Sequence, residues 1–167
     1  MGQLPKRLLE RPSSRLLRRN HQNHSDRMNN VAIRPYKEDD HNFILNSWLN
    51  SFAQESAFSA LIDRDLFFKF HSMAVKNILK RPSTTTLIAT DTPDSDLIYG
   101  YAVYEQIPEY DIFHYIYVKR PFNNFGLAKL LTEKAPFDIK KKYASHSTRS
   151  GKKIIQDNKL KYCPYLI

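Results

Sequence analysis

A chain of 167 residues can form one domain with a sizeable core, and 41% hydrophobic residues, with ten Tyr and ten Phe among them, favour a globular fold. The longest apolar runs are only a few residues, whereas a helix needs about 20 to span a bilayer. We therefore expect a soluble protein without membrane contact. The single cysteine, Cys163, excludes an intramolecular disulfide and a cysteine-rich zinc site, and it suits a reducing compartment such as the cytoplasm.

The formal net charge of +9 is concentrated at the two ends of the chain. Residues 1–30 carry a net +5 and residues 129–167 a net +7, whereas residues 31–128 carry a net −3. A domain that binds duplex DNA more often spreads Lys and Arg over one folded face. Basic ends instead favour weak contact with polyanions, or simply solubility.

Residues 1–30 differ in composition from the rest, with seven Lys or Arg, two prolines and no aromatic residue. This composition predicts a basic, flexible arm that is disordered or weakly helical. Two alternatives are a cleaved targeting peptide and an extension upstream of a start at Met28. The folded domain is predicted over residues 31–167.

Strand and helix signals follow one another from residue 31 onward. The pattern predicts, in chain order, strand 31–36, a helix within 37–56, a helix from Asp63 or Asp65 to Arg81, strands 84–90, 97–107 and 112–120, helix 127–134, strand 142–148, helix 150–158 and strand 160–167. The first helix places Phe43, Trp48 and Phe52 on one face, and Pro82 ends the second. The order β-α-α-β-β-β-α-β-α-β indicates a mixed α/β fold.

The stretch "IYVKRPFNNFGLAKLLTEK" contains one of only four glycines in the chain, at a predicted strand-to-helix junction. The first residues of a helix have backbone N–H groups without intrahelical partners, and such donors attract anions. Gly126 lets the backbone approach a ligand closely, and Ala128 keeps the next turn slim. Arg120 and Lys129 add positive charge nearby. The junction therefore predicts a phosphate site, although Gly126 is also typical of an ordinary turn.

The element order, the "IRPY" strand followed by "KEDD", and the segment "YVKRPFNNFGLAKLL" resemble the GCN5-related N-acetyltransferase (GNAT) family. That family has a pyrophosphate loop of the form Gln/Arg-x-x-Gly-x-Gly/Ala after a strand, and Asn123, Gly126 and Ala128 stand at the matching positions, with Val118 ending the strand. Asn123 departs from the usual Arg or Gln. The "SWLNS" and "YCPYL" segments look like small acetyltransferase-like proteins of bacteriophages and prophages.

The resemblance implies a mostly antiparallel sheet flanked by helices, acetyl-CoA as donor substrate and an amine as acceptor. It also implies a strand bulge near Tyr117 and Val118, where a backbone N–H would bind the thioester carbonyl. The residues expected to contact acetyl-CoA are Tyr117, Val118, Asn123, Asn124, Phe125, Gly126, Leu127 and Ala128.

Strand alternation predicts that Ile112, His114, Ile116 and Val118 share one face. The glutamate base of some family members falls at Ile112, so His114, one step along that face, is the first candidate for the base. A histidine packed in the core is the alternative interpretation. Glu105 is the second candidate.

Many relatives protonate the leaving thiolate with a tyrosine in the helix that corresponds to residues 150–158, where this chain has none. Tyr162, Cys163 and Tyr165 could substitute if the last strand brings them to the thiolate, and Tyr162 is the first candidate; the alternative for both tyrosines is a place in the core or at its rim. A GNAT-fold virion or interaction protein without activity, whose basic ends contact nucleic acid or an acidic partner, is therefore the alternative function. We expect no metal site, a monomer or homodimer, and a location in the cytoplasm, that of a host cell or a virion if the chain is phage-derived.

We expect deletion of residues 1–30 to leave the melting temperature nearly unchanged, because the segment has too few apolar residues to offset its ordering entropy. The deletion should also weaken salt-sensitive binding to heparin or nucleic acid. Thermal unfolding of the full chain and of the chain without residues 1–30 measures the effect on the melting temperature. A large fall in the melting temperature would show that the arm belongs to the core.

Overall fold

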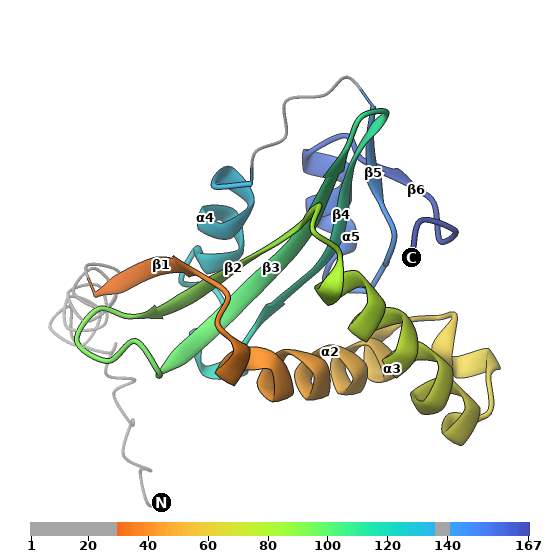
Figure 1. Cartoon of the computed structure of the whole chain (residues 1–167), viewed down its shortest axis with the longest axis horizontal. Helices are drawn as coiled ribbons and strands as arrows, with labels where there is room; N and C mark the ends of the chain where they lie inside the picture. Colours follow the sequence, from red (N-terminus) through yellow and green to blue (C-terminus); the bar gives the residue numbers. More distant parts are fainter. Residues whose placement is uncertain (1–29, 136–140) are drawn as a thin grey trace, which may run out of the picture.

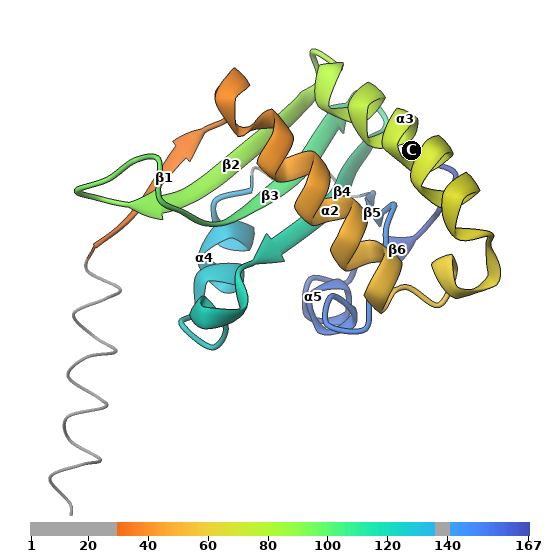
Figure 2. The same cartoon turned by 90° about the horizontal axis from the view of Figure 1, so that it is seen from below.

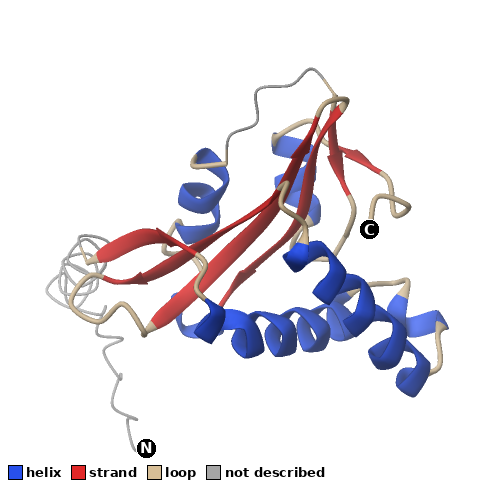
Figure 3. Ribbon diagram, in the orientation of Figure 1, coloured by secondary structure: helices blue, strands red, loops and turns tan. Residues whose placement is uncertain are grey.

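The computed structural model describes residues 30–135 and 141–167. Within these residues, a six-stranded sheet runs in chain order from one edge to the other (Figures 1 and 3). Its strands are β1 (Val31–Pro35), β2 (Thr84–Asp91), β3 (Ile98–Ile107), β4 (Tyr110–Val118), β5 (Lys142–Ala144) and β6 (Lys161–Tyr162). The predicted arm lies, apart from Asn30, outside the described residues.

In the described part of the chain, four α-helices and three short 3-10 helices connect these strands. They are η1 (Glu38–Asp40), α2 (His41–Glu55), η2 (Ser59–Leu61), α3 (Arg64–Lys80), η3 (Arg120–Phe122), α4 (Leu127–Glu133) and α5 (Lys152–Asp157). The predicted element order is confirmed, with shorter final strands. No helix among the described residues is long and apolar enough to cross a membrane.

Strands β1 to β4 pair antiparallel, whereas β5 runs parallel to β4 and β6 parallel to β5. Helices α2 and α3 cover one face of the sheet, and α4 and α5 lie on the other (Figure 2). Each face has its own apolar cluster. Trp48 of α2 stacks on Tyr115 of β4 in the first, and Leu127 and Leu131 of α4 pack in the second. The mixed α/β fold with a mostly antiparallel sheet is confirmed.

Local sequence signals explain where the helices begin and end. The carboxylate of Asp63 accepts hydrogen bonds from the backbone N–H groups of Asp65 and Leu66, both at 3.1 Å, and so caps α3. Helix α3 ends just before Pro82, because proline cannot continue a helix. In α2, the apolar residues Ile44, Trp48, Leu49 and Phe52 are buried at helical spacing.

A bulge in β4 falls at His114, not near Tyr117 and Val118 as predicted. Tyr115 pairs with Val103 and Phe113 with Tyr104, so His114 has no partner of its own on β3. The extra residue changes the phase of the alternation. His114, whose ring contacts Glu105 beside Arg81 at the end of α3, and Tyr115 both point toward the α2–α3 face, whereas Ile116 and Val118 pack on the opposite face. The prediction that His114 shares a face with Ile116 and Val118 is therefore wrong.

Candidate active site

Strands β4 and β5 remain paired over only three residues. Asp111, Ile112 and Phe113 pair with Lys142, Tyr143 and Ala144, and the N–H of Ser145 donates to the carbonyl of Phe113 at 3.1 Å. Beyond this point β5 leaves β4, and no described strand pairs with residues 115–118 on that side. The second half of β4 therefore has an open edge.

The backbone groups on this open edge can be identified from the hydrogen bonds on the other edge. The N–H of Lys119 donates to the carbonyl of Tyr99 at 2.8 Å, and Tyr117 pairs with Tyr101 of β3. Successive backbone groups in a strand point to opposite edges. The N–H groups of Ile116 and Val118 consequently point away from β3, toward the space that β5 has left.

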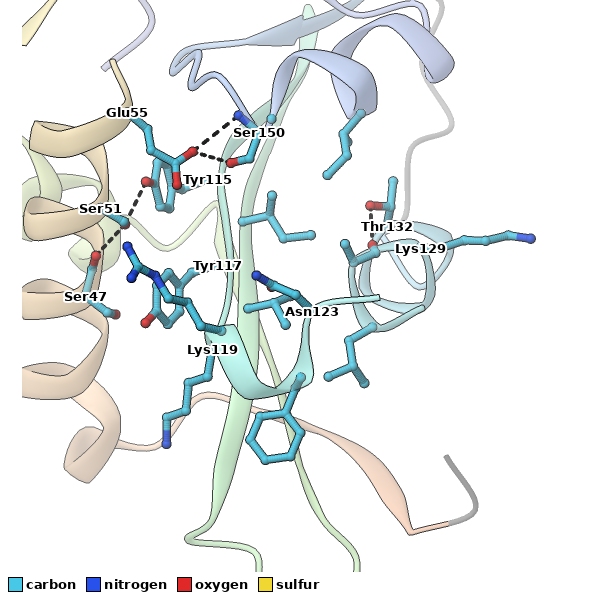
Figure 4. Close-up of a pocket in the computed structure, with 18 of the residues that line it drawn as sticks. Ser47, Ser51, Glu55, Tyr115, Tyr117, Lys119, Asn123, Lys129, Thr132 and Ser150 are labelled. Carbon is cyan, nitrogen blue, oxygen red and sulfur yellow. Dashed lines mark hydrogen bonds between the residues drawn. The ribbon is translucent and has the colours of Figure 1, made fainter. Parts of the chain in front are cut away.

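A cleft of about 1500 Å³ occupies this space. It extends from α2, past the open edge of β4, to the loop before α4 and the start of α5 (Figure 4). Its volume exceeds the roughly 300–1,000 Å³ of an ordinary small-molecule pocket. The cleft is therefore large enough for an extended ligand together with a second, smaller one.

The loop at the α4 end of the cleft has an unusual backbone. Asn124 and Gly126 have φ angles of 69° and 74°, in the left-handed region that favours glycine and tolerates asparagine. Gly126 is the residue before α4, and its carbonyl accepts the first helical hydrogen bond, from Leu130. Among the described residues, the N–H groups of Asn124, Gly126 and Ala128 have no backbone acceptor. These three donors are available to an anion in the cleft.

The residues predicted to contact acetyl-CoA gather around this cleft. Seven of the eight line it; they are Tyr117, Val118, Asn123, Asn124, Gly126, Leu127 and Ala128. Phe125 instead packs beside Phe122 in the apolar cluster of the α4 face. The sequence could anticipate these seven because they are contiguous with the strand and its loop.

The α2 wall of the cleft is polar, and sequence analysis did not identify it. Ser47, Ser51 and Glu55 recur every four residues along α2 and line the cleft. Ser51 Oγ lies 2.9 Å from the hydroxyl of Tyr115, whose pKa burial raises above its ordinary value. The regular spacing is visible in the sequence, but spacing alone does not indicate what such a polar helix face lines.

Glu55 is an acidic group at the junction of α2 and α5. Its Oε2 accepts hydrogen bonds from the backbone N–H of Ser150, at 3.3 Å, and from the Ser150 hydroxyl. Figure 4 shows the carboxylate between Ser150 and Tyr115. Among the described residues, no hydrogen bond reaches Oε1. The carboxylate is thus held by one oxygen and open at the other.

Basic side chains outnumber acidic ones around the cleft. The basic residues that line it are Lys119, Arg120, Lys129 and Lys153, and the acidic ones are Glu55, Glu133 and Asp157. The ammonium of Lys119 lies 4.8 Å from the centre of the Phe43 ring, and burial lowers its pKa. Lys129 is 3.7 Å from Glu133 on an exposed face of α4, a pair of little consequence for stability.

Glu105 and His114 lie outside the cleft, in a hydrogen-bonded chain through the α2–α3 core. Glu105 Oε2 is 3.1 Å from His114 Nε2, and His114 Nδ1 is 2.8 Å from Ser145 Oγ. Ser145 Oγ is also 2.8 Å from His146 Nδ1, and His146 Nε2 is 3.2 Å from His71 Nε2. All five side chains are buried. None of them lines the cleft.

A single arrangement of protons satisfies this chain. The hydrogen bond from His114, followed by those from Ser83 and Arg81, lowers the pKa of Glu105 to about 2 in spite of its burial. Glu105 is therefore ionised and accepts from His114 Nε2. Burial lowers the pKa of His71 to about 4 and also lowers the pKa values of His114 and His146. The three histidine rings are then neutral, and every hydrogen bond in the chain is donated in the direction of Glu105. His71 donates to His146, His146 to the Ser145 hydroxyl, Ser145 to His114, and His114 to Glu105.

Tyr162 of β6 is half exposed and also lies outside the lining of the cleft. The structure thus brings none of the three predicted catalytic side chains to the cleft. A direct catalytic role for His114, Glu105 or Tyr162 stays a prediction. Among the described residues, no group of three or more His, Cys, Asp or Glu is placed to hold a metal ion.

Comparison with solved structures identifies the fold. A protein of Pyrococcus furiosus named as an acetyl transferase has a TM-score of 0.59 and 13% identity over 78% of this chain and 93% of that one. A GNAT-family acetyltransferase of Staphylococcus aureus Mu50 gives 0.56 and 15%, over 77% and 82%. The PaiA N-acetyltransferase of Thermoplasma acidophilum, in complex with coenzyme A, gives 0.55 and 14%, over 77% and 87%.

No protein-family model matches this chain, and no curated protein matches its sequence. The likeness to the three solved structures nevertheless shows that the chain has the fold of the GNAT acetyltransferases. The predicted resemblance is thus confirmed at the level of the fold.

We expect the free energy of unfolding to fall as the pH drops from about 6.5 toward 4. The buried histidines have lowered pKa values in the folded chain, so below pH 6.5 the unfolded chain binds more protons than the folded one. Their contribution to the free energy of unfolding is fully present above pH 6.5 and is lost as the pH falls through the pKa of the folded state. His71→Phe keeps the ring stack on Phe52 and Phe67. Between pH 7 and pH 4, the free energy of unfolding of the variant should therefore fall by on the order of 3 kcal/mol less than that of the wild-type chain.

Urea denaturation at a series of pH values measures this dependence. His41→Gln is the matched control, because His41 does not belong to the buried hydrogen-bonded chain. Its ring contacts only the hydroxyl of Tyr36 among the described hydrogen bonds. If the wild-type and His71→Phe curves stay parallel from pH 7 to 4, His71 is not one of the titrating groups.

Proposed function

We propose that the protein transfers an acetyl group from acetyl-CoA to a primary amine. The observation that carries this proposal is that the open edge of β4 and the donor-rich loop at Gly126 line one continuous cleft. The fold of the chain, shared with acetyltransferases that include a coenzyme A complex, supports the same function.

The loop from Asn123 to Ala128 suits the pyrophosphate of acetyl-CoA. Its free N–H groups supply hydrogen bonds to phosphate oxygens, and the left-handed backbone at Asn124 and Gly126 brings successive donors around a concave turn. Helix α4 has only seven residues, so the backbone donors and not the helix dipole carry the argument. Arg120 and Lys129 add charge for phosphate, and they line the same cleft.

The open edge of β4 suits the amide-containing arm of the donor and its thioester. A ligand with peptide-like groups can pair with an unpaired strand edge as an added strand would. In that position the N–H of Val118 or Ile116 donates to the thioester carbonyl. The donor is fixed by the sheet and stabilises the oxyanion as it forms.

Glu55 is the proposed residue for the acceptor amine. The carboxylate first binds the ammonium group and then takes its proton, directly or through a water. The neutral amine attacks the carbonyl carbon and a C–N bond forms. The nitrogen then loses its second proton, the C–S bond breaks, and the thiolate takes up that proton to give coenzyme A. Glu105 and His114 retain a proposed part, which is to hold β4 in place between β3 and β5. Tyr162 remains the proposed proton donor to the thiolate.

A chain that binds coenzyme A without catalysis is the second candidate function. It is favoured by the absence of a tyrosine in α5 and by the position of His114 and Glu105 outside the cleft. Loss of turnover with intact binding separates the two candidates. The variants below therefore address binding and chemistry in turn.

Gly126→Asp should lower the affinity for coenzyme A at least tenfold, because it places a carboxylate among the donors proposed for phosphate. Gly126→Asn is the matched control, since it has the same shape, tolerates the same φ of 74° and carries no charge. We expect Gly126→Asn to bind more tightly than Gly126→Asp. Isothermal titration and thermal shift with coenzyme A measure both; saturation at 100 times the dissociation constant adds about 2.7 kcal/mol to the stability.

Absence of any thermal shift with millimolar coenzyme A for the wild-type chain would exclude the proposed donor. Equal affinities of the two Gly126 variants would instead show that the loop does not bind phosphate.

Glu55→Gln should lower turnover by about a hundredfold, as expected for loss of a general base, and leave the affinity for coenzyme A unchanged. Ser150→Ala is the matched control, because it removes the hydroxyl that contacts Glu55 and keeps the carboxylate. Release of coenzyme A thiol with a panel of primary amines measures turnover. Full activity of Glu55→Gln would rule out Glu55 as the base.

A further inference from the structure

Large apolar side chains gather on the outside of the molecule around η2 and α3. Of the nine large hydrophobic side chains that are exposed among the described residues, five lie here: Phe58 (53% exposed), Leu61 (89%), Leu66 (50%), Phe70 (58%) and Met73 (56%). We call them the α3 patch. Exposed large apolar side chains concentrated in one stretch of the chain mark an interaction site more often than scattered ones do.

Helix α3 is apolar on two sides. Phe67, His71, Val75 and Ile78 face the core and are buried. Leu66, Phe70 and Met73 stand at i, i+4 and i+7 and form a second stripe on the outer side. A surface helix of a monomeric domain needs one apolar stripe and keeps the other side polar. The second stripe is therefore unexplained by the packing of a single chain.

The charges that flank the stripe differ in sign between the two ends of α3; Arg64, which is also exposed at the start, lies over the ring of Phe68 on another side of the helix. Asp63 and Asp65 are exposed at its start, and Lys76 and Lys80 are exposed near its end. Lys69 lies between them, with its ammonium 5.5 Å from the ring of Phe70. If two copies of α3 pack antiparallel across a two-fold axis near Phe70, Leu66 of one copy meets Met73 of the other. The acidic start of each helix then lies beside the basic end of its partner.

We propose that the α3 patch binds a second copy of this chain, in this antiparallel arrangement. Other occupants fit the charges less well. The segment 1–29 has a net charge of +5 and would meet Lys69, Lys76 and Lys80. An anionic membrane surface would meet Asp65, which lies on the same side of the helix as Lys69 and Lys76. A second copy of α3, packed antiparallel, places an acidic helix start beside each basic helix end and so matches the charges at both ends.

The interface leaves the candidate active site open. None of the residues of the α3 patch lines the cleft. Figure 2 shows α3 at the outer margin of the α2–α3 layer, with α4 and α5 well separated from it. The proposal is thus independent of the proposed function.

Sedimentation equilibrium of the full chain, from about 1 to 200 μM, tests the proposal. The wild-type chain should be a dimer in this range, and Phe70→Glu should be a monomer. Leu97→Glu is the matched control, because Leu97 is also an exposed large apolar residue, in the turn before β3 and away from the patch. It should remain a dimer. Circular dichroism and the melting temperature establish that each variant is folded, and Met73→Lys replaces Phe70→Glu if that variant does not fold.

A charge exchange distinguishes a second copy from any other partner. Asp65→Lys and Lys76→Asp should each weaken the dimer about tenfold, and the double variant should recover at least half of the lost affinity on a logarithmic scale. A wild-type monomer at 200 μM would overturn the proposal, as would a dimer unaffected by Phe70→Glu. A monomer that sediments with anionic phosphatidylserine vesicles, and loses this with Phe70→Glu, would overturn it in favour of a membrane surface.

Discussion

Ser145 joins β5 to β4 twice, and the candidate active site depends on this attachment. Its N–H donates to the carbonyl of Phe113, and its hydroxyl contacts His114, the bulged residue of β4. One residue earlier the two strands are paired, and beyond Ser145 this pairing does not continue among the described residues. The attachment is made of buried polar groups, whose hydrogen bonds are expensive to lose because no water replaces them. The point at which the cleft begins is therefore fixed.

The bulge at His114 has two effects. It turns the ring into the chain that runs from Glu105 to His71 and so ties β3, β4, β5 and α3 together. It also shifts the phase of the strand, so that Tyr115 and Tyr117 face the α2 side, whereas Ile116 and Val118 face the α4 side. Both pairs reach the cleft, since the cleft passes the open edge between the two layers. The α2 wall and the α4 wall of the cleft thus meet at one strand.

Helix α2 serves the core and the cleft with different sides. Trp48 and Phe52 are buried against the sheet, where Trp48 stacks on Tyr115. Ser47, Ser51 and Glu55 line the cleft instead. A displacement of α2 would consequently change the core and the proposed amine site together. By contrast, the loop at Gly126 is attached mainly by Leu127 and Leu131 in the second apolar cluster.

The sequence by itself determined the element order and the loop. Helical and strand periodicity, Pro82 and the sparing use of glycine are local signals, and they act over a few residues. For this reason they predicted α2, α3 and β1 to β4, and they located Gly126 before α4. Seven of the eight loop and strand residues expected at the cofactor line the cleft because they follow one another along the chain.

The tertiary structure alone decided which polar side chains meet. Alternation assumes a regular strand, and a bulge comes from the pairing of β4 with β3, so the orientation of His114 could not be read from its own neighbours. Glu55 reaches Ser150 across 95 positions of the chain, and His146 reaches His71 across 75. No local pattern encodes such contacts. They exist because the two apolar faces of the sheet bring α2, α3, β5 and α5 together, and buried polar groups then have to find partners there.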